Sequence, residues 1–270
     1  MIKLVTIDID DTLVNSAKEI TPRVKAAVQA ATAAGVKIVL TTGRPITGVQ
    51  AYLDELGLNN LEDQYVVTYN GAMIQTTAGT TIGGNPLNHA AYVKLADWAV
   101  EHDYYIQVES SAEAFTPSRK VNPAASGENY MINMPLNIVD VADMDPELAY
   151  VKFMFIEPAA RLQEVRADLD KTDFAQEFTF VQSSTQFLEV LNQAASKGNA
   201  LRTLAGHLNV DISETMAIGD QANDLTMIEA AGLGVAMGNA VPAIKAAAQE
   251  ETTTQNEDGV GVALEKFVLA

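Results

Sequence analysis

Patterns typical of strands and helices alternate along most of this chain, and this alternation limits the folds open to it. An apolar, β-branched run at residues 2–7 precedes an Ala-rich helical stretch, and further strands are predicted at 36–40 and 65–68. Thr21 and Pro22 are typical of a helix start. After residue 196, helices and strands alternate again. This pattern predicts an α/β fold with a mainly parallel sheet flanked by helices.

The middle of the chain differs from both ends in its amino-acid composition. Most of the aromatic residues and the single tryptophan, Trp98, lie between about residues 87 and 188. The sequence Gly-Gly-Asn-Pro at residues 83–86 is typical of a linker. The length of 270 residues allows one large domain or two modest ones. We therefore expect a core formed by residues 1–83 and 189–270, interrupted by an α+β domain at residues 84–188.

Composition excludes several classes of partner and chemistry. Lys and Arg number 17 against 35 Asp and Glu, a formal net charge of −18, which would repel nucleic acid and anionic lipid surfaces. The chain has no cysteine, so it has no disulfide, thiolate metal site or cysteine nucleophile. Asp8 interrupts the first apolar run too early for a secretory signal. We expect a cytoplasmic protein that binds neither nucleic acid nor membranes.

Asp8 and Asp10 follow the first predicted strand. Residues i and i+2 of a strand point to the same side, so the two carboxylates should converge. Ligands of open α/β sheets bind at the carboxyl ends of strands, where this pair lies. Alone, the pair is more simply explained as a polar turn between a strand and a loop. A calcium loop is discounted because Leu13 stands where such a loop requires glycine.

A second acidic group follows the predicted strand at residues 215–218. Asp220 ends that strand, and Asn223 and Asp224 lie about one helical turn further on, so all three can face one point. Acidic residues at a helix start also cap it and complement its dipole. Taken together with the first pair, however, they supply the oxygen ligands that Mg²⁺ prefers.

Two further segments have features suited to phosphate. Lys197 begins a helix after the N-cap candidate Ser196, where the helix dipole disfavours a cation, and Gly198 is a poor helix residue. Local rules broken together often mark function, although a solvated surface lysine is the simpler reading. Thr42 and Gly43 follow the second strand, where a hydroxyl and backbone N–H groups can hold phosphate or merely form a turn.

Other patterns are weaker. Gly232, Gly234 and Gly238 have the wrong spacing for a dinucleotide loop. The three histidines have no metal-ligand spacing. Arg119 and Lys120 could reach an anionic substrate, but solvated surface charge is the simpler interpretation.

Together these motifs resemble the haloacid dehalogenase superfamily of phosphohydrolases, and specifically its Cof-like branch of sugar-phosphate phosphatases. The matching segments, in the family's order, are residues 8–13 (DIDDTL), 42–45 (TGRP), 70–72 (NGA), 196–198 (SKG), 219–224 (GDQAND) and 258–260 (DGV). Asp11 departs from the pattern, since glycine is commoner there. The resemblance implies a Rossmann-like core and an inserted α+β cap that closes over the leaving group and selects the substrate.

The resemblance also implies roles for individual residues. Asp8 would be the nucleophile that forms an aspartyl-phosphate, and Asp10 would protonate the leaving alcohol and then activate water. The implied Mg²⁺ ligands are Asp8, the backbone carbonyl of Asp10, Asp220 and Asp224; the implied phosphate-binding residues are Ile9, Thr42, Gly43, Lys197 and Asn223. The predicted function is a Mg²⁺-dependent phosphatase of small phosphorylated metabolites, such as sugar phosphates, working as a monomer or small homo-oligomer.

Three alternatives remain. A phosphomutase of the same fold would pass the phosphoryl group to a second sugar hydroxyl. A phospho-receiver signalling module also gathers acidic residues, Mg²⁺, a hydroxyl and a lysine, but it would be about half this length and have no cap. A catalytically inactive binding protein is disfavoured because every reactive position is filled.

Overall fold

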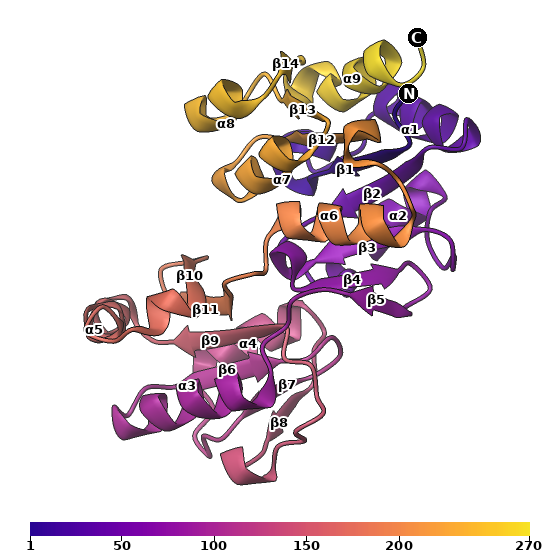
Figure 1. Ribbon diagram of the computed structural model, residues 1–270. Helices are drawn as coiled ribbons and strands as arrows, with labels where there is room; N and C mark the ends of the chain where they lie inside the picture. Colours follow the sequence, from indigo (N-terminus) through magenta and orange to yellow (C-terminus); the bar gives the residue numbers. More distant parts are fainter. The chain divides into compact units, whose positions relative to one another are not determined.

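The computed structural model describes residues 1–270, which form two compact units (Figure 1). The first, which we call the core unit, combines residues 1–84 with residues 196–270. The second, which we call the inserted unit, consists of residues 85–195. Each unit has its own cluster of buried apolar side chains, as expected of a domain.

An eight-stranded sheet forms the centre of the core unit, in the order β14-β13-β12-β1-β2-β3-β4-β5. Its strands are β1 (Leu4–Ile7), β2 (Lys37–Thr41), β3 (Tyr65–Thr68), β4 (Met73–Thr76), β5 (Thr81–Gly83), β12 (Thr215–Gly219), β13 (Leu233–Ala236) and β14 (Glu250–Glu251). Neighbours from β14 to β3 run parallel, whereas β3, β4 and β5 pair antiparallel. Every residue of β1 is buried, because a strand inside a parallel sheet is covered on both faces.

Two groups of helices cover the faces of this sheet (Figure 1). They are α1 (Pro22–Ala33), α2 (Gln50–Leu56), α6 (Lys197–His207), α7 (Leu225–Ala230), α8 (Pro242–Ala247) and α9 (Gly259–Phe267). α1 contacts α2 and α9, and α7 contacts α6 and α8. At the start of α1, Thr21 Oγ1 accepts a hydrogen bond from the Val24 N–H at 3.3 Å. The predicted α/β fold, with a mainly parallel sheet flanked by helices, is confirmed.

The inserted unit is built on a six-stranded sheet in the order β10-β11-β9-β6-β7-β8, antiparallel except between β7 and β8. Its elements are α3 (His89–Glu101), β6 (Ile106–Glu109), β7 (Ala114–Thr116), α4 (Pro123–Met131), β8 (Leu136–Ile138), β9 (Lys152–Ile156), α5 (Ala159–Leu169), β10 (Phe178–Gln182) and β11 (Phe187–Asn192). Tyr92 stacks on Tyr150 with 4.9 Å between ring centroids, and Trp98 lies edge-on to Phe155 at 5.8 Å. These contacts explain why aromatic residues are concentrated in this part of the sequence.

The second crossing between the units differs from its predicted position. The sequence predicts a return to the core at residue 189, whereas the structure places it at Ser196. Residue 189 lies inside β11, which pairs with both β9 and β10, so a boundary there would divide a strand of the inserted sheet. No helix of the structure has both the length and the apolar composition that crossing a lipid bilayer requires.

Gly198 allows α6 to pack closely against α7. A Cβ atom at Gly198 would lie 2.2 Å from the backbone oxygen of Thr226, and the Gly198 N–H donates to Thr226 Oγ1 at 3.1 Å. Only glycine permits this approach without displacing the backbone. Gly198 lies in a segment whose sequence is suited to phosphate, but its close neighbour in the structure is another helix.

We expect Gly198→Ala to lower the free energy of unfolding by about 1–3 kcal/mol, the usual cost of overpacking. Gly206→Ala on the same helix is the matched control, because nothing lies within 4 Å of a Cβ atom there. The control should be stabilising by about 0.4–1 kcal/mol, since alanine restricts the unfolded chain more than glycine does. Urea denaturation measures both changes, and equal midpoints for the two variants would contradict this account of Gly198.

Candidate active site

The predicted site residues follow the carboxyl ends of neighbouring parallel strands. In the sheet, Ile7 of β1 is paired with Leu40 of β2 on one side and with Ile218 of β12 on the other. Asp8, Thr42 and Asp220 therefore emerge at one edge of the core sheet, as parallel strands require. The Asp8 N–H donates to the Ile218 carbonyl at 3.1 Å, and the Thr42 N–H donates to the Val67 carbonyl at 2.9 Å.

A tight turn at residues 9–13 follows β1. The Leu13 N–H donates to the Asp8 carbonyl at 3.1 Å, and Asp11 has a left-handed conformation with φ of 57°. Aspartate tolerates this conformation and glycine prefers it, which explains why Asp11 can replace the commoner glycine. Asn239 Nδ2 supports the turn by donating to the Asp11 carbonyl at 2.8 Å. The Ile9 side chain is buried in the core, so only its backbone could contact a phosphate.

Three carboxylates and one lysine meet inside the core unit. Asp8, Asp220 and Asp224 each place an oxygen within 4.8 Å of the other two, and all three residues are buried. The fully buried Lys197 Nζ lies 2.5 Å from Asp8 Oδ1 and 2.6 Å from Asp224 Oδ1. The structure thus joins the residues that follow β1 and β12 to the first residue of α6.

Asp220 and Asp224 accept further hydrogen bonds. Asp220 Oδ1 accepts a hydrogen bond from Thr12 Oγ1 at 2.8 Å. Asp224 Oδ2 accepts from the backbone N–H groups of Asp220 and Gln221 at 2.9 and 3.0 Å. Thr12 lies inside the first motif, but local sequence patterns do not reveal this contact, because its partner is 208 positions away.

The electrostatic balance of this cluster favours a further cation. Burial raises the pKa of Asp8 to about 7 and the pKa of Asp220 to about 6. Burial alone would lower the pKa of Lys197, but Asp8 and Asp224 raise it above its usual value. Three carboxylates thus share one ammonium group. An oxygen-rich site short of positive charge fits a hard divalent cation.

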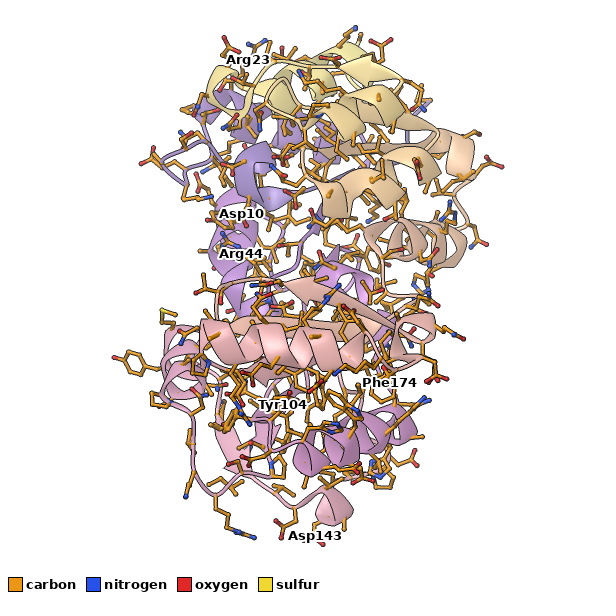
Figure 2. The ribbon with its side chains drawn as sticks, turned by 90° about the vertical axis from the view of Figure 1, so that its left-hand side faces the viewer. Asp10, Arg23, Arg44, Tyr104, Asp143 and Phe174 are labelled. Carbon is orange, nitrogen blue, oxygen red and sulfur yellow. The ribbon has the colours of Figure 1, made fainter.

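Asp10 has a different environment from Asp8. Its side chain is 42% exposed and lies beside Arg44 (Figure 2). Arg44 Nε and Nη2 donate to the two carboxylate oxygens at 2.9 and 2.6 Å, and Lys18 Nζ donates at 3.0 Å. Burial opposes ionisation, but the hydrogen bonds from Arg44 and Lys18 lower the pKa of Asp10.

Asp8 and Asp10 have different side-chain partners, Lys197 and Arg44, because the period of two that predicts their convergence holds only within a strand. β1 ends at Ile7, and the turn that follows points the carboxylate of Asp10 toward Arg44. The Asp10 side chain is not part of the buried carboxylate cluster.

Asn70 connects the remaining predicted residues. Its N–H donates to the Thr42 carbonyl at 2.9 Å, and its Oδ1 accepts from Asn223 Nδ2 at 3.1 Å. A Cβ atom at Gly43 would lie 3.1 Å from Asn70 Nδ2. Thr42, Gly43 and Asn223 are thus brought together through Asn70. The 70–72 motif was the signal for this residue, but its spacing does not reveal which side chain it contacts.

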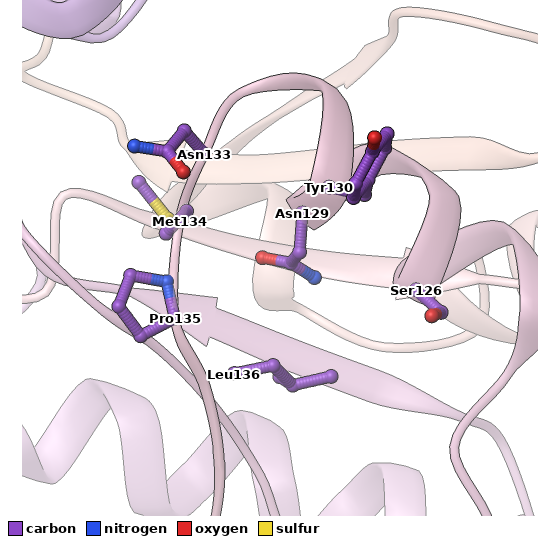
Figure 3. Close-up of a pocket in the computed structure, with 7 residues that line it drawn as sticks. All are labelled: Ser126, Asn129, Tyr130, Asn133, Met134, Pro135 and Leu136. Atoms are coloured by element: carbon purple, nitrogen blue, oxygen red, sulfur yellow. The ribbon is translucent and has the colours of Figure 1, made fainter.

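The weaker sequence candidates lie elsewhere. Arg119 pairs with Asp140 at 3.0 Å on the surface. A Cβ atom at Gly234 would lie 2.4 Å from the Ile228 carbonyl oxygen, so this glycine serves packing. A cavity of about 470 Å³ lies beside α4 in the inserted unit, lined in part by Asn129, Tyr130 and Leu136 (Figure 3). This cavity contains no carboxylate or cation for phosphoryl transfer.

Carboxylates suited to a metal ion, beside a buried lysine and hydrogen-bond donors, are groups that enzymes of the phosphoryl-transfer class use. A family model described as haloacid dehalogenase-like hydrolase matches residues 5–264. The chain therefore belongs to the haloacid dehalogenase-like hydrolases. Within that family it is a phosphatase.

Individual relatives match along nearly their whole length. YxeH of Bacillus subtilis (strain 168) is 42% identical over 271 residues, covering 100% of both chains. From the same organism, the 5-amino-6-(5-phospho-D-ribitylamino)uracil phosphatase YcsE is 31% identical over 269 residues, covering 99% of this chain and 96% of YcsE. The crystal structure of a haloacid dehalogenase-like hydrolase from Bacteroides thetaiotaomicron superposes with a TM-score of 0.81 at 30% identity, covering 98% and 99% of the chains.

We expect Lys197→Met to lower the free energy of unfolding by about 3–5 kcal/mol in buffer containing EDTA, because two buried carboxylates lose their shared counter-ion. Lys3→Met is the control, since Lys3 forms an exposed ion pair with Glu214 at 2.8 Å in the same unit. Its loss should stay below about 1 kcal/mol. Urea denaturation provides the comparison, and equal losses for the two variants would contradict the structural importance of Lys197.

Proposed function

We propose that this enzyme is a Mg²⁺-dependent phosphatase that hydrolyses small phosphomonoesters through an aspartyl-phosphate intermediate. The observation that carries the proposal is the buried Asp8 carboxylate, held 2.5 Å from Lys197 Nζ and grouped with Asp220 and Asp224. A buried carboxylate beside cation-binding groups can attack a phosphoryl group whose negative charge is neutralised in place.

In the first step, an oxygen of Asp8 attacks phosphorus while the bond from phosphorus to the leaving alcohol breaks. Asp10, in its protonated form, gives its proton to the departing oxygen. In the second step, Asp10 takes a proton from water, the water oxygen attacks phosphorus, and the Asp8 carboxylate is released with inorganic phosphate. Lys197 neutralises part of the negative charge on the transferred group in both steps.

The remaining residues hold the metal and the phosphate. Bound Mg²⁺ would neutralise phosphoryl charge and orient the group for in-line attack. The residues proposed to hold it are Asp8, the Asp10 carbonyl, Asp220 and Asp224. The donors proposed for the phosphoryl oxygens are the Thr42 hydroxyl, Lys197, the Asn223 amide and the backbone N–H groups of Ile9 and Gly43.

We propose that the substrate is a small phosphorylated metabolite, with sugar and sugar-alcohol phosphates as the first class to test. The relative YcsE is named for a substrate that carries its phosphate on a ribityl chain. The net charge of −18 disfavours nucleic acid and anionic membranes as partners. We propose that the inserted unit acts as a cap that selects the leaving group. We also propose that the enzyme works as a monomer or a small homo-oligomer.

We expect Asp8→Asn to abolish turnover of a panel of sugar phosphates with Mg²⁺, because the amide cannot act as the nucleophile. Asp10→Asn should lower kcat by about 10²–10⁴-fold, the usual contribution of an acid–base group, and a covalent phosphate adduct should accumulate on the protein. Asp11→Asn is the matched control, because asparagine also tolerates the left-handed conformation at this position. Phosphate release and intact-protein mass spectrometry give the readouts.

The products separate the competing functions. Undiminished activity in Asp8→Asn would overturn the mechanism. Isomerised sugar phosphate without free phosphate, or a requirement for a bisphosphate activator, would identify a phosphomutase. A single stable phosphorylation without turnover would identify a receiver-like module.

Mg²⁺ affinity should fall as the pH is lowered from about 8 to about 5, because metal ions displace protons from their ligands. The pKa values of Asp8 and Asp220 are raised to about 7 and about 6, so protonation in this interval removes the charges that hold the cation. Calorimetry in two buffers of different ionisation enthalpy measures the proton release. Asp220→Asn should weaken binding and reduce its pH dependence, whereas pH-independent affinity would exclude these carboxylates as ligands.

A further inference from the structure

Arg44 binds the carboxylate of Asp10 through two hydrogen bonds. Its Nε donates to Asp10 Oδ2 at 2.9 Å and its Nη2 donates to Oδ1 at 2.6 Å. Two parallel hydrogen bonds from a planar guanidinium fix both the position and the direction of a carboxylate. Lys18 also contacts Asp10, but through one bond from a half-exposed side chain, which fixes position much less.

Arg44 is itself held from several sides. Its Nη1 donates to the Gly48 carbonyl at 3.3 Å, and its guanidinium lies 5.7 Å from the centre of the Tyr52 ring. Its backbone N–H donates to Thr42 Oγ1 at 3.1 Å. The side chain that orients Asp10 is therefore part of the same turn that carries the proposed phosphate-binding hydroxyl of Thr42.

We propose that Arg44 is the positioning residue for Asp10, acting on the reaction through that carboxylate. This inference rests on the proposed function, which assigns Asp10 the proton transfers. Asp10 lies in a turn after β1 and its side chain is 42% exposed, so core packing alone does not fix its orientation. The two hydrogen bonds from Arg44 restrict that orientation. They also connect the proton-transfer group to the turn that carries Thr42.

The geometry requires arginine at this position. A lysine ammonium is a point charge that can satisfy one carboxylate oxygen at a time and leaves the carboxylate free to rotate. The alternative role for Arg44 is direct contact with the substrate. In the structure, three of its N–H groups are directed to Asp10 and the Gly48 carbonyl, so these three are not available for such a contact.

The test combines Arg44→Ala and Arg44→Lys with Asp10→Ala in a double-mutant cycle, using hexose phosphate and Mg²⁺. We expect Arg44→Ala to lower kcat by about 10–100-fold, comparable to the cost of misplacing a reacting group by about 1 Å. KM should change less than about threefold, since substrate binding is retained. Arg44→Lys should restore little of kcat. In the Asp10→Ala background, Arg44→Ala should cause no further loss, because its target is gone.

Arg23→Ala is the matched control. Arg23 forms the same two-point pair with Glu265, at 3.0 and 2.6 Å, in the same unit but away from Asp10 (Figure 2). The Arg23→Ala substitution removes an equivalent arginine–carboxylate pair, and kcat should be unchanged. Circular dichroism and calorimetric Mg²⁺ binding establish that each variant is folded. If Arg44→Ala does not fold, Arg44→Lys carries the same test, because it keeps the positive charge and removes only the two-point geometry.

Each outcome has a distinct meaning. Normal kcat in a folded Arg44 variant overturns the inference, and so does a raised KM at unchanged kcat. A loss that persists at full size in the Asp10→Ala background also overturns it, because Arg44 would then act on the substrate directly. If Asp10→Ala itself keeps wild-type turnover, the assignment of Asp10 in the proposed function fails, whatever Arg44 shows.

Discussion

The ammonium group of Lys197, buried between Asp8 and Asp224, is the interaction on which the site depends. Removing a lysine and two carboxylates from water is costly, and their mutual attraction must compensate for it. The contacts join the turn after β1, the start of α6 and the segment after β12, which are far apart in the sequence. Because Asp220 adds a third carboxylate, the same cluster that holds these segments together remains short of positive charge.

The shortage of positive charge in this cluster bears on how a chain with a large net negative charge can bind an anionic substrate. A net charge of −18 would repel an anionic substrate from most of the surface. The acidic residues at the sheet edge would have the opposite effect, since a divalent cation bound there would, with Lys197, create a positive region at the point of reaction. The acidic cluster and the anionic substrate are therefore compatible.

Asp8 and Asp10, two positions apart, have opposite electrostatic environments. Burial raises the pKa of Asp8 to about 7, while Arg44 and Lys18 overcome the effect of burial and lower the pKa of Asp10. These directions are the reverse of the usual pattern, in which the acid has the raised pKa and the nucleophile stays ionised. A cation bound beside Asp8 would favour the ionised form of that carboxylate. The difference between Asp8 and Asp10 originates in the turn after β1, which ends strand geometry before Asp10.

Much of the arrangement was already determined by the sequence. Local periodicity and turn residues predicted the main strands and the α/β class, because hydrophobic spacing depends only on neighbouring residues. Parallel strands then required Asp8, Thr42 and Asp220 to share one edge. The tertiary structure decided which groups come into contact: Thr12 with Asp220, Arg44 with Asp10, and Gly198 with the Thr226 backbone. These contacts join segments 28 to 208 positions apart, and only the packing of strands and helices, which local patterns do not encode, brings such groups into contact.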